Sequence, residues 1–232
     1  MRIPLPTYKL NAGGEYEMKN LSFTQEFYLC ALKKQGGSTL IKNTESSICL
    51  LAGALLELLM DESIVIGEKN KVLVKKELSK DKLYLEPVYQ LIAQRKPMKI
   101  EEIAGEYSFD FKKPAQLFES IGKSLFLSGY ITEESGRGLF KNKVYFIPKE
   151  EEVIKIVEKL RAEFLEEGNI SDEVIVLGAL LNKNGMIKKY FSEYEVQMLN
   201  RRLKEIKQSE ANLLVKKMMD YINTLLVVIS MP

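Results

Sequence analysis

The side chains best suited to chemistry in this sequence are basic, and they gather in two segments that each predict a β-hairpin. The first segment has no acid between residues 69 and 76, and its cations are Lys69, Lys71, Lys75 and Lys76. The second has no acid between residues 135 and 149, and its cations are Arg137, Lys141, Lys143 and Lys149. Cations concentrated in this way favour the binding of phosphate or other anionic groups.

The second segment also carries an apolar pair, Leu139 and Phe140, within the expected turn "GRGLFKNK". Turns are usually polar, so this position favours a tip that enters a membrane interface while the cations meet anionic headgroups. Burial of a Leu or Phe contributes about 1.5–3 kcal/mol, and each cation near an anionic surface about 1 kcal/mol. That total suits reversible attachment. The other interpretation is that the pair folds back onto the core or begins the second strand.

Catalytic and metal-binding patterns are missing from the sequence. No histidine occurs in the 232 residues, which removes Ser-His-Asp and Cys-His catalysis and most zinc sites. Glycine-rich phosphate loops and nucleophile elbows are missing as well. Cys30 and Cys49 lie in apolar segments without metal-ligand spacing, so we expect a buried, reduced pair. We therefore expect a protein that is not an enzyme, with no catalytic residue, metal ion or cofactor.

The longest apolar stretch, "ICLLAGALLELLM" (residues 48–60), predicts a buried central helix of about residues 46–60. It has only 13 residues before Asp61 and contains Glu57, whereas a membrane span needs about 20 apolar residues. A helix that is apolar on nearly every side lies inside a domain. Glu57 is expected to be structural, bonding a lysine, an arginine or the backbone.

The remaining patterns predict a mainly α-helical protein, with a single domain of helices around the central helix and two small β-hairpins. Residues 1–20 hold two prolines and a Gly-Gly pair and predict an irregular arm, so the domain is expected over residues 21–232. Ser22 with Gln25 predicts a capping box at the first helix. Gly129 predicts the end of the helix that precedes the second hairpin, which spans residues 131–147.

Nucleic acid is not an expected partner. Residues 98–147 read as helix, helix and hairpin, which is similar to a winged helix. The net charge is only +2, however, and the second helix offers only Gln116 and Lys123 to base edges.

Three motifs resemble the Golgi phosphoprotein 3 family. "LSFTQEFYLCALKKQGG", "LLAGALLELLMDESIVI" and "LFESIGKSLFLSGYITEE" occur here in the order and spacing of that family. The resemblance covers roughly residues 21–229 and implies helices wrapped around a buried central helix. The content of Lys, Glu and Ile fits a divergent prokaryotic member.

The resemblance also implies a function, because eukaryotic members are peripheral membrane proteins that bind phosphatidylinositol 4-phosphate and insert a hairpin. Their headgroup pocket uses a tryptophan and three arginines, which fall near Lys42, Leu50 or Leu51, Ala115 and Phe118. At these positions this chain has neither the tryptophan nor any of the arginines. Lysines nearby supply point charges, but they lack the planar guanidinium group of arginine. The implied headgroup-binding residues are Lys42, Lys112, Lys113, Arg137, Lys141 and Lys143. The implied membrane-inserting residues are Leu139 and Phe140.

We therefore expect a cytoplasmic protein that is peripheral on a membrane surface and recognises a phosphoinositide or another anionic phospholipid. The alternative is a protein-interaction or scaffold module. In that case the same hairpin and the apolar end "LLVVISMP" would contact a partner, or a second copy in a homo-oligomer, without lipid.

Overall fold

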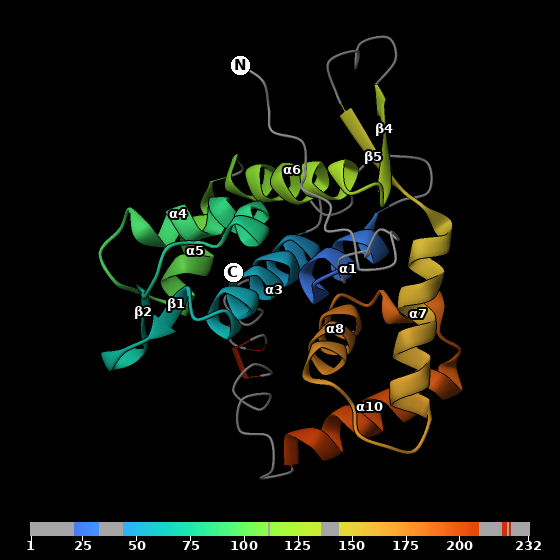
Figure 1. Ribbon diagram of the computed structural model, residues 1–232. Coiled ribbons are helices and arrows are strands. Elements are labelled where there is room, and N and C mark those ends of the chain that lie inside the picture. Colours follow the sequence, from blue (N-terminus) through green and yellow to red (C-terminus); the bar gives the residue numbers. More distant parts are fainter. Residues whose placement is uncertain are drawn as a thin grey trace, which may run out of the picture.

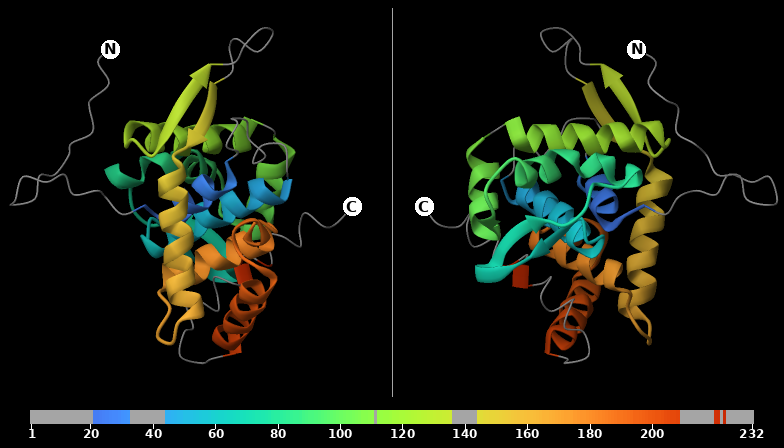
Figure 2. Two further views of the ribbon diagram at one scale, coloured as in Figure 1. Left: turned by 90° about the vertical axis from the view of Figure 1, so that its right-hand side faces the viewer. Right: turned by 60° about the vertical axis from the view of Figure 1, so that its left-hand side comes forward.

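The computed structural model describes residues 21–32, 44–110, 112–135, 144–208, 220, 221 and 223. These residues form one mainly α-helical domain with two small antiparallel sheets (Figures 1 and 2), which confirms the predicted fold class. The expected arm, residues 1–20, and most of an expected C-terminal helix, residues 211–229, lie outside the described residues.

The described helices are α1 (Phe23–Ala31), α3 (Thr44–Met60), α4 (Glu86–Ala93), α5 (Ile100–Phe109), α6 (Lys112–Leu127), α7 (Glu150–Leu165), α8 (Asp172–Lys183), α9 (Ile187–Tyr190) and α10 (Glu193–Gln208). Two 3-10 helices are η1 (Glu68–Asn70) and η2 (Lys80–Leu85). The strands are β1 (Ile64–Ile66), β2 (Lys71–Val74), β3 (Met98–Lys99), β4 (Ile131–Ser135) and β5 (Val144–Pro148).

The central helix α3 is the axis of the core, as the apolar stretch predicts. Its residues 46–58 are all buried, and α1, α4, α5, α6 and α8 pack around it (Figure 1). Gly53 allows the close approach of α1, because a Cβ there would lie 3.1 Å from Thr24 Oγ1. Across the described part of the chain, no helix combines the length and the apolar content needed to cross a bilayer.

Local signals in the sequence set several element boundaries. Ser22 and Gln25 form the predicted capping box at the start of α1. Gly129 has φ +78°, and the N–H of Tyr130 donates to the carbonyl of Leu125 at 3.0 Å, which ends α6 in a left-handed turn. Both predicted boundaries are confirmed.

The two cysteines are free and buried, as predicted. Burial raises the pKa of the Cys30 and Cys49 thiols to about 12. Both thiols are therefore protonated and unreactive at neutral pH.

The first predicted hairpin exists, with one more strand than expected. β1 pairs with β2 from Ile64↔Val74 to Ile66↔Val72, and η1 lies in the connection between them. β3 then pairs with the other edge of β2, which places Lys99 opposite Lys71. A two-residue strand has no periodicity to reveal it.

Glu26 of α1 is a buried carboxylate between α1 and α7. One of its oxygens accepts a hydrogen bond from Lys159, and the other has no partner among the described residues. Burial raises the pKa of the Glu26 carboxyl, Lys159 opposes this, and Glu163 and Glu173 add to it. The folded protein therefore holds a proton on Glu26 more tightly than the unfolded chain does.

A Glu26→Gln variant should be more stable than the wild type at neutral pH. With a folded pKa above the ordinary 4.5, Glu26 favours folding fully below that value and loses this contribution as the pH rises through the folded pKa. Glutamine does not titrate. Thermal melts from about pH 4 to 8 should show the variant gaining about 2–4 °C on the wild type, which corresponds to about 1 kcal/mol. Exposed Glu158→Gln is the control, and a difference that is independent of pH would contradict the prediction.

Candidate functional site

The predicted lipid-binding surface involves α6 and the β4–β5 hairpin. α6 covers one side of the domain, and the hairpin rises beyond it from its C-terminal end (Figures 1 and 2). The exposed face of α6 follows a helical spacing, because one stripe of the helix points away from the core. Its members are Lys112, Gln116, Glu119, Lys123 and Phe126.

The hairpin is fixed to the core by a row of aromatic rings. Phe118 of α6 packs between Tyr28 of α1 and Phe146 of β5, with ring centroids 4.8 and 5.8 Å apart. Phe146 lies directly over Gly122, where an added Cβ would approach Phe146 Cδ2 and the Tyr28 hydroxyl to 2.6 Å. Only glycine permits this contact, so Gly122 sets how the hairpin sits on α6. Sequence reasoning missed this role.

The strands confirm the second predicted hairpin, whereas its tip lies outside the described residues. β4 and β5 pair from Ile131↔Pro148 to Ser135↔Val144. The predicted residues that lie outside the described ranges are Lys42, Arg137, Leu139, Phe140, Lys141 and Lys143. Their roles remain predictions.

Lys112 and Lys113 lie at the other end of α6 from the hairpin. The helix has 16 residues, so this separation is about 24 Å along its axis. Lys112 is exposed, whereas the Lys113 ammonium is bound to the Glu106 carboxylate at 3.3 Å and to the Glu106 carbonyl at 3.3 Å. The structure therefore separates these two lysines from the hairpin.

The stem of the hairpin is acidic, although the sequence of its tip is basic. Glu133 and Glu134 of β4 are exposed, and exposed Glu151 lies in the first turn of α7, which follows β5 directly. An anionic surface would repel these carboxylates, so only the tip is suited to approach it.

The first basic cluster is partly neutralised. Lys75 pairs with Glu62 at 2.7 Å and Lys76 with Asp61 at 3.5 Å. Solvent and salt screen such pairs at the surface, so they add little to stability. They leave less positive charge on this hairpin than the sequence indicates.

Two cations that sequence reasoning missed lie near Lys113. Arg95 Nε is 3.5 Å from the same Glu106 carboxylate that binds Lys113, and Lys96 beside it is exposed. Arg95 and Lys113 are far apart in the sequence, so no local charge count could join them. The only local signal was the run "FDFKK" at residues 109–113.

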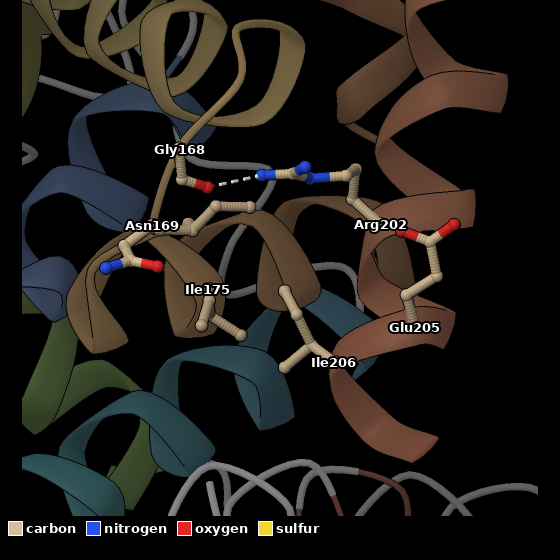
Figure 3. Close-up of a pocket in the computed structure, with 7 residues that line it drawn as sticks. Gly168, Asn169, Ile175, Arg202, Glu205 and Ile206 are labelled. Carbon is tan, nitrogen blue, oxygen red and sulfur yellow. Dashed lines mark hydrogen bonds between the residues drawn. The ribbon is translucent and has the colours of Figure 1, made fainter. Parts of the chain in front are cut away.

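A cleft of about 500 Å³ lies between the α7–α8 loop, α8 and α10 (Figure 3). Its apolar lining residues are Ile170, Ile175 and Ile206, and the others are Gly168, Asn169, Arg202 and Glu205. Arg202 donates a hydrogen bond to the Gly168 carbonyl at 2.9 Å (Figure 3). This bond closes the loop onto α10. Of the predicted site residues that the structure describes, Lys112 and Lys113, neither lines the cleft.

The helices around a buried axis and the β4–β5 hairpin beyond α6 define the class of this protein, a helical domain that presents a hairpin at one end. The family model of Golgi phosphoprotein 3 (GPP34) matches residues 23–224. The chain therefore belongs to the Golgi phosphoprotein 3 family, which confirms the resemblance carried by the three motifs. Membership is consistent with a lipid-binding role in general, and the family is not known as one of enzymes. A comparison with curated proteins gave no match.

Proposed function

We propose that this protein binds reversibly to the cytoplasmic surface of membranes that contain anionic phospholipid. The observation that carries the proposal is the hairpin, whose paired strands are fixed to α6 by Phe146 over Gly122 and project beyond the rest of the domain (Figure 2). The sequence between those strands supplies Leu139 and Phe140 for the interface and Arg137, Lys141 and Lys143 for headgroups.

The proposed recognition is of negative surface charge rather than of one headgroup. Leu50, Leu51 and Phe118, at or near the family's arginine positions, are buried and pack in the core. Lys113 is bound to Glu106. The lysines that remain act as point charges, which select phosphates less sharply than arginine forks do.

Insertion should be shallow. The exposed carboxylates of Glu133 and Glu134 begin just below the tip, and moving them toward anionic headgroups would oppose binding. Two apolar side chains and three cations contribute several kcal/mol before the cost of ordering the tip. That is consistent with reversible attachment.

The test is co-sedimentation with three kinds of vesicle: neutral lipid, neutral lipid with phosphatidylglycerol, and neutral lipid with phosphatidylinositol 4-phosphate. The wild type should bind both anionic mixtures equally at matched charge. A Leu139→Ser, Phe140→Ser double variant should bind at least about tenfold more weakly, because it loses the burial of two apolar side chains. Binding should also weaken as salt rises.

A matched control is Leu83→Ser with Tyr194→Ser, two exposed side chains on η2 and α10, which should leave binding unchanged. No binding of the wild type at low salt would refute the proposal. A preference for the phosphoinositide at equal charge would refute the proposed lack of headgroup selectivity.

Exposed apolar side chains favour a second candidate function, a protein-interaction module. Phe126 and Leu127 of α6 and Val144 of β5 are 42–54 % exposed. Such a module would form a concentration-dependent oligomer, or hold a partner, whether or not lipid is present. Analytical ultracentrifugation of the wild type with and without vesicle lipid distinguishes the two.

A further inference from the structure

An unusual combination of side chains occurs at the corner where the end of α4, the end of α5 and the start of α6 meet. Phe109, the last residue of α5, is 90 % exposed, more than any other large apolar side chain in the described part of the chain. A single exposed apolar residue needs no explanation by itself. Here, however, Lys112 and Lys113 follow it closely in the sequence.

The corner carries an excess of positive charge. Arg95 and Lys113 share the Glu106 carboxylate at 3.5 and 3.3 Å, which leaves one acid between two cations. The side chains of Lys96 and Lys112 are exposed. The other acid of the corner is Asp110, which accepts a hydrogen bond from the Lys112 backbone N–H at 3.0 Å. Four cations therefore face two carboxylates.

The corner and the hairpin lie at opposite ends of α6 (Figure 1). On the outer stripe between them, Glu119 and Lys123 pair at 2.6 Å and neutralise each other. The helix thus separates the corner from the foot of the hairpin stem by about 24 Å. Two weak contacts on one folded domain act together, because the second forms at high effective concentration once the first has formed.

We propose that Arg95, Lys96, Phe109, Lys112 and Lys113 form a second contact with the anionic membrane surface, which together with the hairpin fixes the tilt of the domain on that surface. This inference rests on the proposed function of the hairpin. The side chains of the corner favour a membrane as the binding partner. The excess cations attract anionic headgroups, and an exposed phenylalanine suits the boundary between headgroups and acyl chains.

The direct test places a probe on the corner. A Phe109→Cys variant is labelled with an environment-sensitive dye, and only the new thiol should react because Cys30 and Cys49 are buried. Vesicles with phosphatidylglycerol should shift the dye emission to the blue. A Tyr194→Cys variant, labelled at another exposed position on α10, should show no shift on the same vesicles.

Affinity gives the second measurement. Phe109→Ser should weaken binding to phosphatidylglycerol vesicles about tenfold, since the ring leaves the interface. Lys96→Gln with Lys112→Gln should weaken it at low salt by about fivefold for each charge removed. The Tyr194→Ser variant is the control, because it removes an exposed aromatic side chain away from the corner and should leave vesicle binding unchanged.

The outcomes separate this inference from the function on which it rests. If the wild type binds vesicles but the Phe109→Cys probe does not shift and Phe109→Ser binds normally, the second contact is refuted and the hairpin proposal stands. If the wild type binds no vesicles at all, both are refuted. Loss of a protein contact in Phe109→Ser, with vesicle binding unchanged, would assign the corner to a protein partner and also refute the inference.

Discussion

Replacement of Lys82 by methionine should lower the free energy of unfolding by about 3–5 kcal/mol, because it removes the cation from a buried carboxylate. Glu57 lies in the last turn of α3 and is only 3 % exposed. Its Oε1 accepts hydrogen bonds from the Lys82 ammonium and the Tyr84 hydroxyl, and its Oε2 has no partner among the described residues. Without Lys82, the negative charge would remain buried with one neutral donor.

Tyr84 cannot replace Lys82, because it brings no charge. Burial and the adjacent Glu57 carboxylate raise the pKa of the Tyr84 phenol well above its ordinary value, so the hydroxyl keeps its proton. The hydroxyl also lies 3.0 Å from Ser22 Oγ. The network thus joins η2, α3 and the start of α1, and its loss should affect the whole domain rather than one loop.

Urea unfolding followed by circular dichroism measures the effect. Lys80→Met, an exposed lysine on the same 3-10 helix, is the matched control and should stay within about 0.5 kcal/mol of the wild type. A Lys82→Met, Glu57→Gln double variant should recover most of the loss, since it removes the unpaired charge. Equal stability of Lys82→Met and Lys80→Met would show that Glu57 does not depend on this ion pair.

Glu57 shows how far the sequence could predict the fold. An acid within "LLAGALLELLM" indicated a structural side chain bonded to a lysine, an arginine or the backbone, and the structure shows it buried and paired with a lysine. The sequence could not identify Lys82 as that cation. The two residues are 25 positions apart, and η2 has no periodic pattern that would orient its side chains. The apolar neighbours of Glu57 in the sequence indicate that it needs a partner, whereas only the tertiary packing shows that the partner is Lys82.

The same division holds for the candidate site. A glycine-rich turn between two short strands predicted the β4–β5 hairpin, and Gly129 predicted where α6 ends, because these features depend on neighbours in the chain. The contacts that set the orientation of the hairpin do not depend on neighbours in the chain. Tyr28, Phe118 and Phe146 come from three separate elements. Lys112 and Lys113 were predicted near a headgroup pocket, but their position at the far end of α6 depends on the helix length and the packing of α5.

Gly122→Ala should re-aim the hairpin and reduce both stability and vesicle binding. The added methyl group would lie 2.6 Å from Phe146 Cδ2 and from the Tyr28 hydroxyl, so at least one ring must move. Phe146 is 4 % exposed and Tyr28 is fully buried. Because neither has free space, overpacking should cost about 1–3 kcal/mol of unfolding free energy.

Urea unfolding and vesicle co-sedimentation of the same samples measure the two effects together. Gly105→Ala on α5, where a Cβ meets nothing within 4 Å, is the matched control and should be neutral or stabilising by up to about 1 kcal/mol. Adding Phe146→Leu to Gly122→Ala should relieve the clash and restore part of the stability. If Gly122→Ala loses stability but binds vesicles as well as the wild type, the aim of the hairpin does not control attachment. If it loses neither stability nor vesicle binding, Phe146 and Tyr28 can move to accept the methyl group, and the predicted clash is wrong.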